Sequence, residues 1–414
     1  MESRFNSLRQ GIKAKIMREM DFSKDISDEE MLSMIDDLMA KELRNLAVSV
    51  EERKSLRTAI FHSIRKLDIL QQLVDDPSVT EIMINGVDNL FIERDGKLDK
   101  YDVSFESKEK LEDVVQQIVA SCNRVVNEAS PIVDARLENG SRVNIVLPPI
   151  ALNGPIITIR RFPENPMTME RLIGFGALTE HLRDYLKVLV KSGYNIFISG
   201  GTGSGKTTFL NALSGYIPKD SRVLTIEDNA ELQIRGVPNL VRLEARNANV
   251  EGCKEITIRD LIKSSLRMRP DWIIVGEVRG SECVDMLQAM NTGHMAMSTG
   301  HSNSAEDMLA RIETMVLMGM EIPLSAVRGQ IAAGIDIIVH LGRLRDRSRK
   351  VLEICELKKE LDPVTGKIIT NPLFRFEETG ESESGKICGE WRKVGELKNN
   401  EKLLASGYSL PAEP

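Results

Sequence analysis

The sequence predicts an α/β protein whose main domain is a parallel β-sheet covered by helices. In residues 171–376, short apolar runs alternate with stretches of helical periodicity, which is typical of buried parallel strands joined by helices. A glycine-rich segment, residues 200–207, lies between one of these runs and a helical stretch. Residues 1–66, in contrast, carry only helical patterns. A chain of 414 residues has room for two or three domains, and the change in pattern along the chain agrees with that number.

Residues 1–66 are predicted to form a bundle of short helices. Ser27 and Glu30 match the S-x-x-E capping box, in which each side chain binds a backbone N–H at the start of a helix, and Ser49 with Glu52 repeats the pattern. Apolar residues follow each box at helical spacing, so each helix has one apolar face. These faces predict packing between the helices. A second role, as a docking module for a partner protein, stays open at this stage.

Residues 67–162 are predicted to form a small α/β domain. Ser107 begins a helix with one apolar face, and Asp95-Gly96 is a typical hairpin turn. The prolines of residues 163–170 exclude a continuous helix, so this stretch is expected to be a linker to the main domain. The strands expected in the small domain are residues 79–84, 89–93, 141–147 and 156–162.

Composition limits the classes of function. No run approaches the ~18 apolar residues that span a bilayer, and the first residues lack an apolar signal core, so a cytoplasmic protein is expected. The net charge of −7 and the 4% aromatic content argue against nucleic acid as a partner. The five cysteines form no CxxC pair, which argues against a zinc site. Residues 377–414 are polar and are expected to be a loosely ordered tail.

The clearest chemical signal is the segment GGTGSGKT, residues 200–207, which matches G-x-x-x-x-G-K-[ST] in full. It follows an apolar strand pattern and precedes a helical one, as a phosphate-binding loop requires. The glycines allow backbone N–H groups to surround a polyphosphate, Lys206 supplies a positive charge, and Thr207 offers a hydroxyl to Mg²⁺. ATP with Mg²⁺ is therefore the expected ligand. The predicted nucleotide-binding residues are Gly201, Thr202, Gly203, Ser204, Gly205, Lys206, Thr207 and Thr208.

Two further strands end in acidic residues. The apolar run at residues 271–276 is followed by Glu277, which in a parallel sheet should lie at the same edge as the phosphate-binding loop and hold Mg²⁺ through water. The run at residues 223–226 ends in Glu227 and Asp228, one of which could orient and deprotonate the attacking water. The alternative for each is an ordinary surface acid at the end of a core strand.

His294 and His301 flank another short apolar run, and each follows a glycine. A single histidine is most often a structural residue. A pair at the two ends of one strand in a nucleotide-binding domain suggests a functional role, and His301, at the carboxyl end, is placed to contact a γ-phosphate.

Four segments in this order resemble the motifs of one family. GGTGSGKTT, TIEDNAEL, RPDWIIVGEVRG and TGHMAMSTGHSNS resemble the Walker A, Asp-box, Walker B and His-box motifs of the type II/type IV secretion ATPase superfamily. Segments in residues 76–98 and 134–162 are similar to those of its CpaF-like branch, the tight-adherence (Flp) pilus assembly ATPases. The resemblance covers residues 67–376. It implies a RecA-like ATPase core, a homohexamer, and work on an inner-membrane platform protein at the cytoplasmic face of the membrane.

The resemblance also implies roles for individual residues. Glu227 takes the position of the catalytic base, and Glu277 that of the Walker B ligand of Mg²⁺. His301 takes the position that contacts the γ-phosphate, and His294 the first His-box position. The family also uses arginines of the smaller domain at the phosphates. The residues that match these arginines best are Arg142 and Arg160, with Arg136 and Arg161 as weaker matches.

Three rival functions share part of this pattern. A GTPase would need an N-K-x-D sequence, which does not occur. A RecA-like nucleic-acid translocase, or an ATPase of a DNA-transfer secretion system, would share the sheet and the ring, although the acidic charge argues against bound DNA. A nucleotide-gated scaffold without catalysis would not need Glu227 and Glu277. The sequence leaves open whether the machine extends a pilus, retracts it or secretes protein.

Overall fold

The computed structural model describes residues 2–20, 26–44, 46, 48–94, 97–122, 124–161, 167–246, 254–383 and 385–412. They divide into two compact units, Met1–Glu164 and Asn165–Pro414. The predicted Asp95-Gly96 turn and the first half of the predicted linker, residues 163–166, lie outside the described residues. The smaller domain and the helical bundle thus belong to one unit, and the main domain forms the other.

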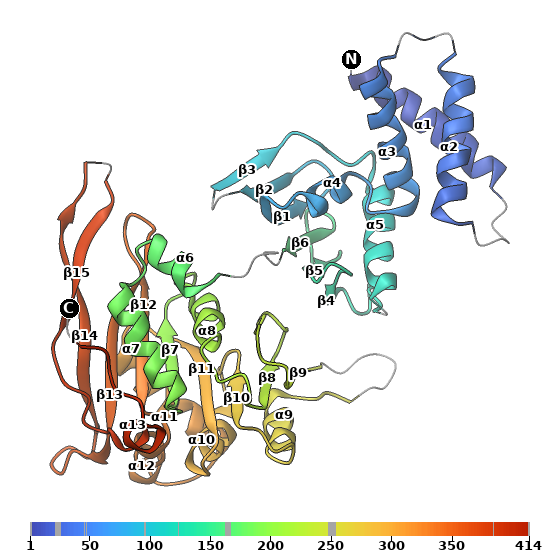
Figure 1. The fold of residues 1–414 in the computed structure, drawn as a ribbon. Helices are drawn as coiled ribbons and strands as arrows, with labels where there is room; N and C mark the ends of the chain where they lie inside the picture. Colours follow the sequence, from blue (N-terminus) through green and yellow to red (C-terminus); the bar gives the residue numbers. More distant parts are fainter. Residues whose placement is uncertain are drawn as a thin grey trace. The chain divides into compact units, whose positions relative to one another are not determined.

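The first unit begins with three amphipathic helices (Figure 1). Both predicted capping boxes are formed, with Ser27 as the N-cap residue of the second helix and Ser49 as that of the third. The apolar faces meet in a core that includes Ile16, Ile35 and Ile60, which confirms the predicted bundle. The helices are α1 (Glu2–Glu19), α2 (Asp28–Glu42) and α3 (Val50–Arg65), followed by a short helix α4 (Ile69–Asp75).

A six-stranded sheet completes the first unit. Its strand order is β3-β2-β1-β6-β5-β4, and every neighbouring pair is antiparallel. Along the inner strands β5 and β6, buried residues alternate with half-buried or exposed ones, because one face packs on a core that α4 and α5 contribute to. Strands β3 and β4 were not expected from the sequence. The elements are β1 (Val79–Asn85), β2 (Leu90–Arg94), β3 (Lys97–Tyr101), α5 (Lys108–Ser121), β4 (Ile132–Arg136), β5 (Arg142–Val146) and β6 (Ile156–Arg160).

The second unit is built on a nine-stranded sheet with the order β15-β14-β13-β12-β7-β11-β10-β8-β9. The six strands from β12 to β9 are parallel, as predicted, and β13 to β15 extend the sheet as an antiparallel edge. The strands are β7 (Ile196–Gly200), β8 (Val223–Glu227), β9 (Leu240–Glu244), β10 (Trp272–Val275), β11 (Met295–His301), β12 (Ile337–Arg343), β13 (Arg349–Leu361), β14 (Ile368–Glu381) and β15 (Ile387–Lys393).

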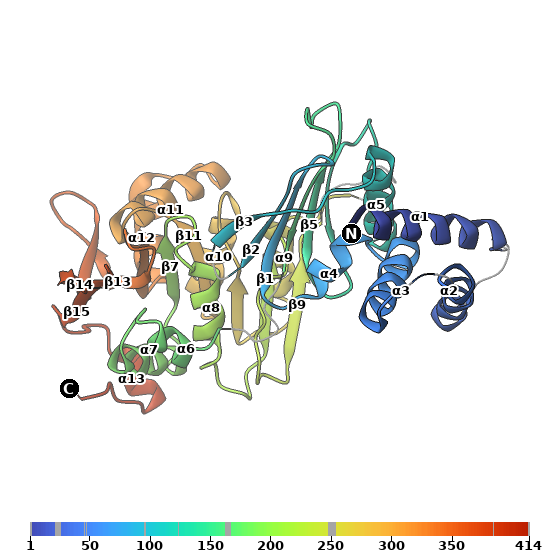
Figure 2. The same ribbon diagram turned by 90° about the horizontal axis from the view of Figure 1, so that it is seen from above.

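Helices cover both faces of this sheet, so the unit has three layers (Figure 2). One core cluster joins the sheet to α6, α7, α8 and α13, and the other joins it to α9, α10, α11 and α12. None of the described helices combines the length and the apolar character that crossing a bilayer requires. The helices are α6 (Met169–Gly174), α7 (Glu180–Lys191), α8 (Lys206–Ser214), α9 (Ile258–Ser265), α10 (Glu282–Asn291), α11 (Ala305–Gly319), α12 (Leu324–Gly334) and α13 (Glu401–Ser406).

The expectation of a loosely ordered tail over residues 377–414 is wrong for the residues described there. Strand β14 continues to Glu381, β15 pairs with it, and α13 packs on the core through Leu403. Trp391 of β15 lies against Phe376 with ring centroids 4.9 Å apart, and its Nε1 donates to the carbonyl of Val351. A strand was expected only over residues 372–376 of β14. The end of β14 and all of β15 escaped prediction because their outward faces are charged and their ordering depends on contacts distant in sequence.

Two buried carboxylates hold the last segment against the sheet. Asp336, only 1% exposed, accepts hydrogen bonds from the ammonium groups of Lys359 and Lys402, both at 2.6 Å. Glu356, also 1% exposed, accepts from the backbone N–H of Asn399 at 2.6 Å. Since a buried carboxylate is costly without partners, these contacts tie α13 to the start of β12 and to β13.

Candidate nucleotide-binding site

The phosphate-binding loop connects β7 to α8 with the predicted turn. Gly203 and Gly205 adopt φ angles of +73° and +91°, in the left-handed region that glycine tolerates best. At Gly200 a Cβ atom would lie 2.5 Å from the carbonyl oxygen of Leu341 and 2.6 Å from Ser204 Oγ, so no side chain fits there. The first turn of α8, which begins at Lys206, leaves backbone N–H groups without helical partners, and these groups favour an anion.

Lys206 is 7% exposed and points back over the loop. Its Nζ donates to the carbonyl of Gly201 at 3.0 Å and lies 3.1 Å from Nδ1 of His301. Burial lowers the pKa of Lys206, while the negative charge of Glu277 acts in the opposite direction. A partly buried ammonium beside a ring of backbone N–H groups is well suited to bind a polyphosphate.

His301 connects Lys206 to Glu277. An ammonium group can only donate, so Nδ1 of the imidazole accepts, and the proton of the neutral ring lies on Nε2. Nε2 is 2.9 Å from Oε1 of Glu277. Burial, followed by the charge of Lys206, lowers the pKa of His301, which favours the neutral ring. The three predicted residues therefore form one continuous chain of contacts at the carboxyl edge of the parallel sheet.

Arg279 holds the other oxygen of Glu277 and was not among the site residues predicted from the sequence. Its Nη2 donates to Glu277 Oε2 at 2.7 Å, and its Nη1 lies 4.0 Å from Asp228 Oδ2. The sequence pattern that could have indicated Arg279 is a cationic residue two positions after Glu277, the acidic residue that follows β10. Arg279 thus binds Oε2 of Glu277 by a hydrogen bond, whereas His301 approaches Oε1 at 2.9 Å without forming a hydrogen bond of regular geometry.

Glu227 ends β8, the strand next to β10, and is 3% exposed. Its Oε1 accepts hydrogen bonds from the backbone N–H groups of Glu231 at 2.8 Å and Leu232 at 2.9 Å. A Cβ on Gly276 would lie 2.9 Å from Glu227 Cγ, so the side chain crosses directly over that glycine, next to Glu277. The structure therefore brings both predicted acids to the same edge of the sheet.

The residues present fit Mg²⁺ bound together with a nucleotide. Mg²⁺ is commonly held by one or two protein oxygens, with phosphates and water completing the coordination. Thr207, half-buried in the first turn of α8, and Glu277 supply a hydroxyl and a carboxylate. Among the residues that the structure describes, no group of three acids, histidines or cysteines could hold a metal alone. Because Glu277 is bound by Arg279 and His301, a water-mediated contact fits this geometry best.

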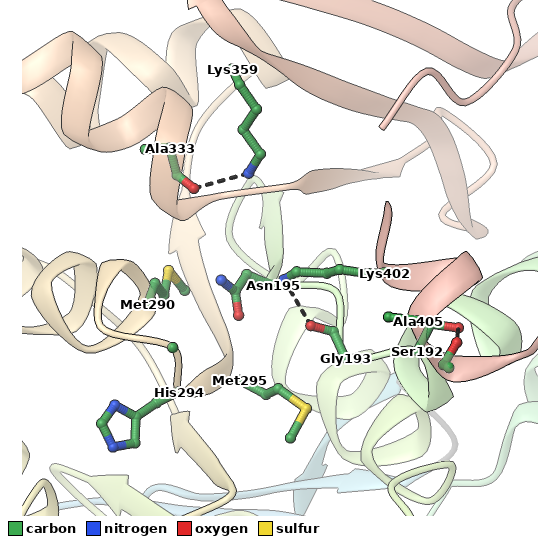
Figure 3. Close-up of a pocket in the computed structure, with 12 residues that line it drawn as sticks. Ser192, Gly193, Asn195, Met290, His294, Met295, Ala333, Lys359, Lys402 and Ala405 are labelled. Carbon is green, nitrogen blue, oxygen red and sulfur yellow. Dashed lines mark hydrogen bonds between the residues drawn. The ribbon is translucent and has the colours of Figure 1, made fainter. Parts of the chain in front are cut away.

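His294 does not join this site. It precedes β11 at the amino end, whereas His301 ends the strand, and a strand of seven residues is ~20 Å long. His294 instead lines a separate pocket of about 450 Å³ with Lys359 and Lys402 (Figure 3). Its Nδ1 lies 3.3 Å from the hydroxyl of Thr292. The prediction that both histidines serve the nucleotide therefore does not fit the structure.

Arg142 and Arg160 belong to the first unit, whereas the phosphate-binding loop belongs to the second. Strand pairing places Arg136, Arg142 and Arg160 directly opposite one another on β4, β5 and β6. Arg160 is largely exposed, with Nε 3.5 Å from Oε1 of Glu81. Arg161 has a structural role, because its Nη1 donates to the carbonyls of Asp76 and Val79.

The chain is similar in sequence and fold to known proteins. The family model of the type II/IV secretion system protein matches residues 64–383. The conjugal transfer protein TrbB of Rhizobium radiobacter is 33% identical over 305 residues, which cover 71% of this chain and 90% of TrbB. The type IV secretion system protein VirB11 of Brucella suis is 31% identical over 304 residues, or 66% of this chain and 84% of VirB11. The crystal structure of the pilus retraction motor PilT with bound ADP superposes with a TM-score of 0.51 at 20% identity, over 74% of this chain and 81% of PilT, and shows the same fold.

Proposed function

The chain belongs to the type II/IV secretion system protein family, and from this premise we propose that it is an ATPase that works as a ring-shaped motor. The observation that carries the proposal is the chain of contacts from Lys206 through His301 to Glu277 beside the phosphate-binding loop. It joins a phosphate-binding cation, a ring that can sense the γ-phosphate and a metal-binding acid in one network.

In this proposal ATP binds with its phosphates along the loop and the first turn of α8. Lys206 contacts the β- and γ-phosphates, and Thr207 and Glu277 would hold Mg²⁺, which would neutralise charge on the phosphates. His301 lies next to Lys206, so it meets the γ-phosphate when Lys206 turns toward the nucleotide. Loss of the γ-phosphate then allows the contact between Lys206 and His301 to form again.

Glu227 acts as the catalytic base. Two backbone N–H groups fix its Oε1, and Gly276 leaves room for its side chain, so the carboxylate has one defined orientation. A fixed carboxylate next to the metal ligand can orient and deprotonate the attacking water. Its burial excludes bulk water from the carboxylate.

The active form in this proposal is a homohexamer in which arginines of the first unit complete the site. Arg142 and Arg160 lie on one exposed face of an antiparallel sheet, where a phosphate can reach them. Arginines that arrive when a site closes stabilise charge in the transition state. Closure and hydrolysis would then move one unit against the other and displace a partner.

The partner that we propose is an inner-membrane platform protein of a pilus or secretion machine, reached from the cytoplasmic face of the membrane. The CpaF-like segments favour assembly of a tight-adherence pilus. The similarity to TrbB supports a second candidate, an ATPase of a DNA-transfer system. The net charge of −7 and the few aromatic residues favour the first candidate.

An ATPase assay of the full chain tests the function and the choice between candidates. We expect hydrolysis that stops when EDTA removes Mg²⁺ and that is unchanged by added single- or double-stranded DNA. Absence of hydrolysis over a range of protein concentrations would contradict the ATPase. Strong stimulation by DNA would instead favour the DNA-transfer candidate.

A further inference from the structure

The hairpin of β12 and β13 stands beside the phosphate-binding loop. β12 is paired with β7, with Leu341 opposite Gly200, and the hairpin continues past this point to the pair Arg343 and Arg349. The other neighbour of β7 is β11, which carries His301. The hairpin therefore flanks the loop on the side away from His301 and Glu277.

Both arginines lie against glycines of the loop. Arg349 Nε donates to the carbonyl of Gly203 at 2.8 Å, and its Cδ would be 3.4 Å from a Cβ placed on Gly205. Arg343 Nη1 would be 3.8 Å from a Cβ on Gly203. The bond to Gly203 uses only one of the five N–H donors of Arg349, so the terminal amino groups remain available to a ligand.

The charges of these two arginines are not balanced by nearby acids. Both are exposed, and in the described part of the chain no carboxylate forms an ion pair with either. Arg345 of the same hairpin differs, because it binds Glu378 at 2.6 Å and Glu381 at 2.7 Å. In a protein of net charge −7, two unbalanced guanidinium groups beside an anion-binding loop indicate a bound anion.

We propose that Arg343 and Arg349 bind the phosphates of the nucleotide from the side of the loop opposite Glu277. This inference rests on the proposed function, in which the loop holds ATP. Guanidinium groups bind phosphate oxygens in pairs and keep their charge at any physiological pH. The two arginines lie on the far side of the loop from the acids that split the terminal phosphate. They therefore bind the part shared by ATP and ADP, and they set affinity rather than the rate of the chemical step.

The test is a titration of the full chain by calorimetry with ADP, a non-hydrolysable ATP analogue and inorganic pyrophosphate. The variants are Arg343→Gln, Arg349→Gln and their combination. Arg347→Asn is the matched control: it removes one charge from the same hairpin, and Asn tolerates the φ of +67° found there. We expect each single variant to raise Kd about tenfold for all three ligands, the double variant to raise it further, and the control to change it less than about twofold.

Three outcomes would overturn the inference. Kd values of both single variants within about twofold of the control would show that the arginines do not contact the ligand. Weaker binding of the nucleotides with unchanged binding of pyrophosphate would assign the arginines to the base or ribose. If the unmodified chain binds none of the three ligands, the proposed function itself fails. Circular dichroism of each variant shows whether the fold is kept, and Arg343→Gln breaks no hydrogen bond recorded within the described residues.

Discussion

Nζ of Lys206 lies 3.1 Å from Nδ1 of His301. The two residues are 95 positions apart in sequence, yet strand pairing sets them side by side, because His301 of β11 is opposite Gly200 at the start of the phosphate-binding loop. The same imidazole reaches Glu277 with its other nitrogen. A ligand that moves Lys206 must therefore also change what the histidine and the acid contact, and under the proposed function this would let the site distinguish ATP from ADP.

Replacement of His301 should reduce turnover while nucleotide binding persists. We expect His301→Ala to lower kcat about tenfold or more, because the ring orders Lys206 and Glu277 around the γ-phosphate. His294→Ala is the matched control, at the other end of the same strand, and should leave kcat and KM unchanged. Steady-state ATPase kinetics measure both. Equal losses of kcat in the two variants would mean that the integrity of β11 determines the rate, and not the contacts of His301 with Lys206 and Glu277.

Replacement of Glu227 and replacement of Glu277 should impair ATP hydrolysis in different ways. Glu227→Gln should bind Mg-ATP normally and lower kcat about 100-fold or more, because it keeps the shape and loses the base. Glu277→Gln should also raise the Mg²⁺ concentration that gives half the maximal rate by about tenfold. Magnesium titrations of the ATPase rate separate the two cases. Identical magnesium curves for both variants would refute the separate roles.

The row of arginines in the first unit should act on the transition state. We expect Arg142→Ala and Arg160→Ala to leave the Kd for ADP unchanged and to lower kcat about 100-fold or more. Lys108→Ala, an exposed cation on α5 of the same unit, controls for the loss of charge. The rate per subunit should also rise with protein concentration as rings form. A rate independent of concentration, together with active arginine variants, would exclude a site completed by the first unit.

The carboxylate of Asp336 should be a main support of the C-terminal segment. Asp336→Ala would leave Lys359 and Lys402 without their acid, and we expect the free energy of unfolding to fall by about 2–3 kcal/mol, since both lysines are partly exposed. Glu383→Ala, an exposed acid beyond β14, should change it by less than about 0.5 kcal/mol. Urea unfolding followed by circular dichroism gives both values. Similar stability of the two variants would show that α13 is held by other contacts.

The core strands of the second unit could be predicted because they are buried on both faces and read as continuous apolar runs. β10 is the clearest case, as each of its residues is fully buried. The loop could be predicted because its chemistry depends on a local sequence. The strand β15 could not, since its order depends on Trp391 reaching Val351 and Phe376, which are distant in sequence.

The site residues that could be predicted from the sequence are those whose position follows from the direction of a strand. Glu227 and His301 end parallel strands and Glu277 follows one, so the three residues meet at one edge. The same rule separates His294, which precedes its strand, and applying it would have removed this residue from the predicted site. Arg279, Arg343 and Arg349 could not be found in this way, because side-chain contacts decide their place: Arg279 binds Glu277, and the other two lie against the phosphate-binding loop.

We propose that this chain hydrolyses ATP at the phosphate-binding loop, and the variant Lys206→Ala is the sharpest test of this proposal. The ammonium group stabilises negative charge that develops on the phosphates, so its loss acts on the chemical step. The measurement is the amount of phosphate released from ATP by the purified full chain in the presence of Mg²⁺, with circular dichroism to confirm folding. We expect clear phosphate release by the unmodified chain and none above background by folded Lys206→Ala. Near-normal release by the folded variant would contradict it.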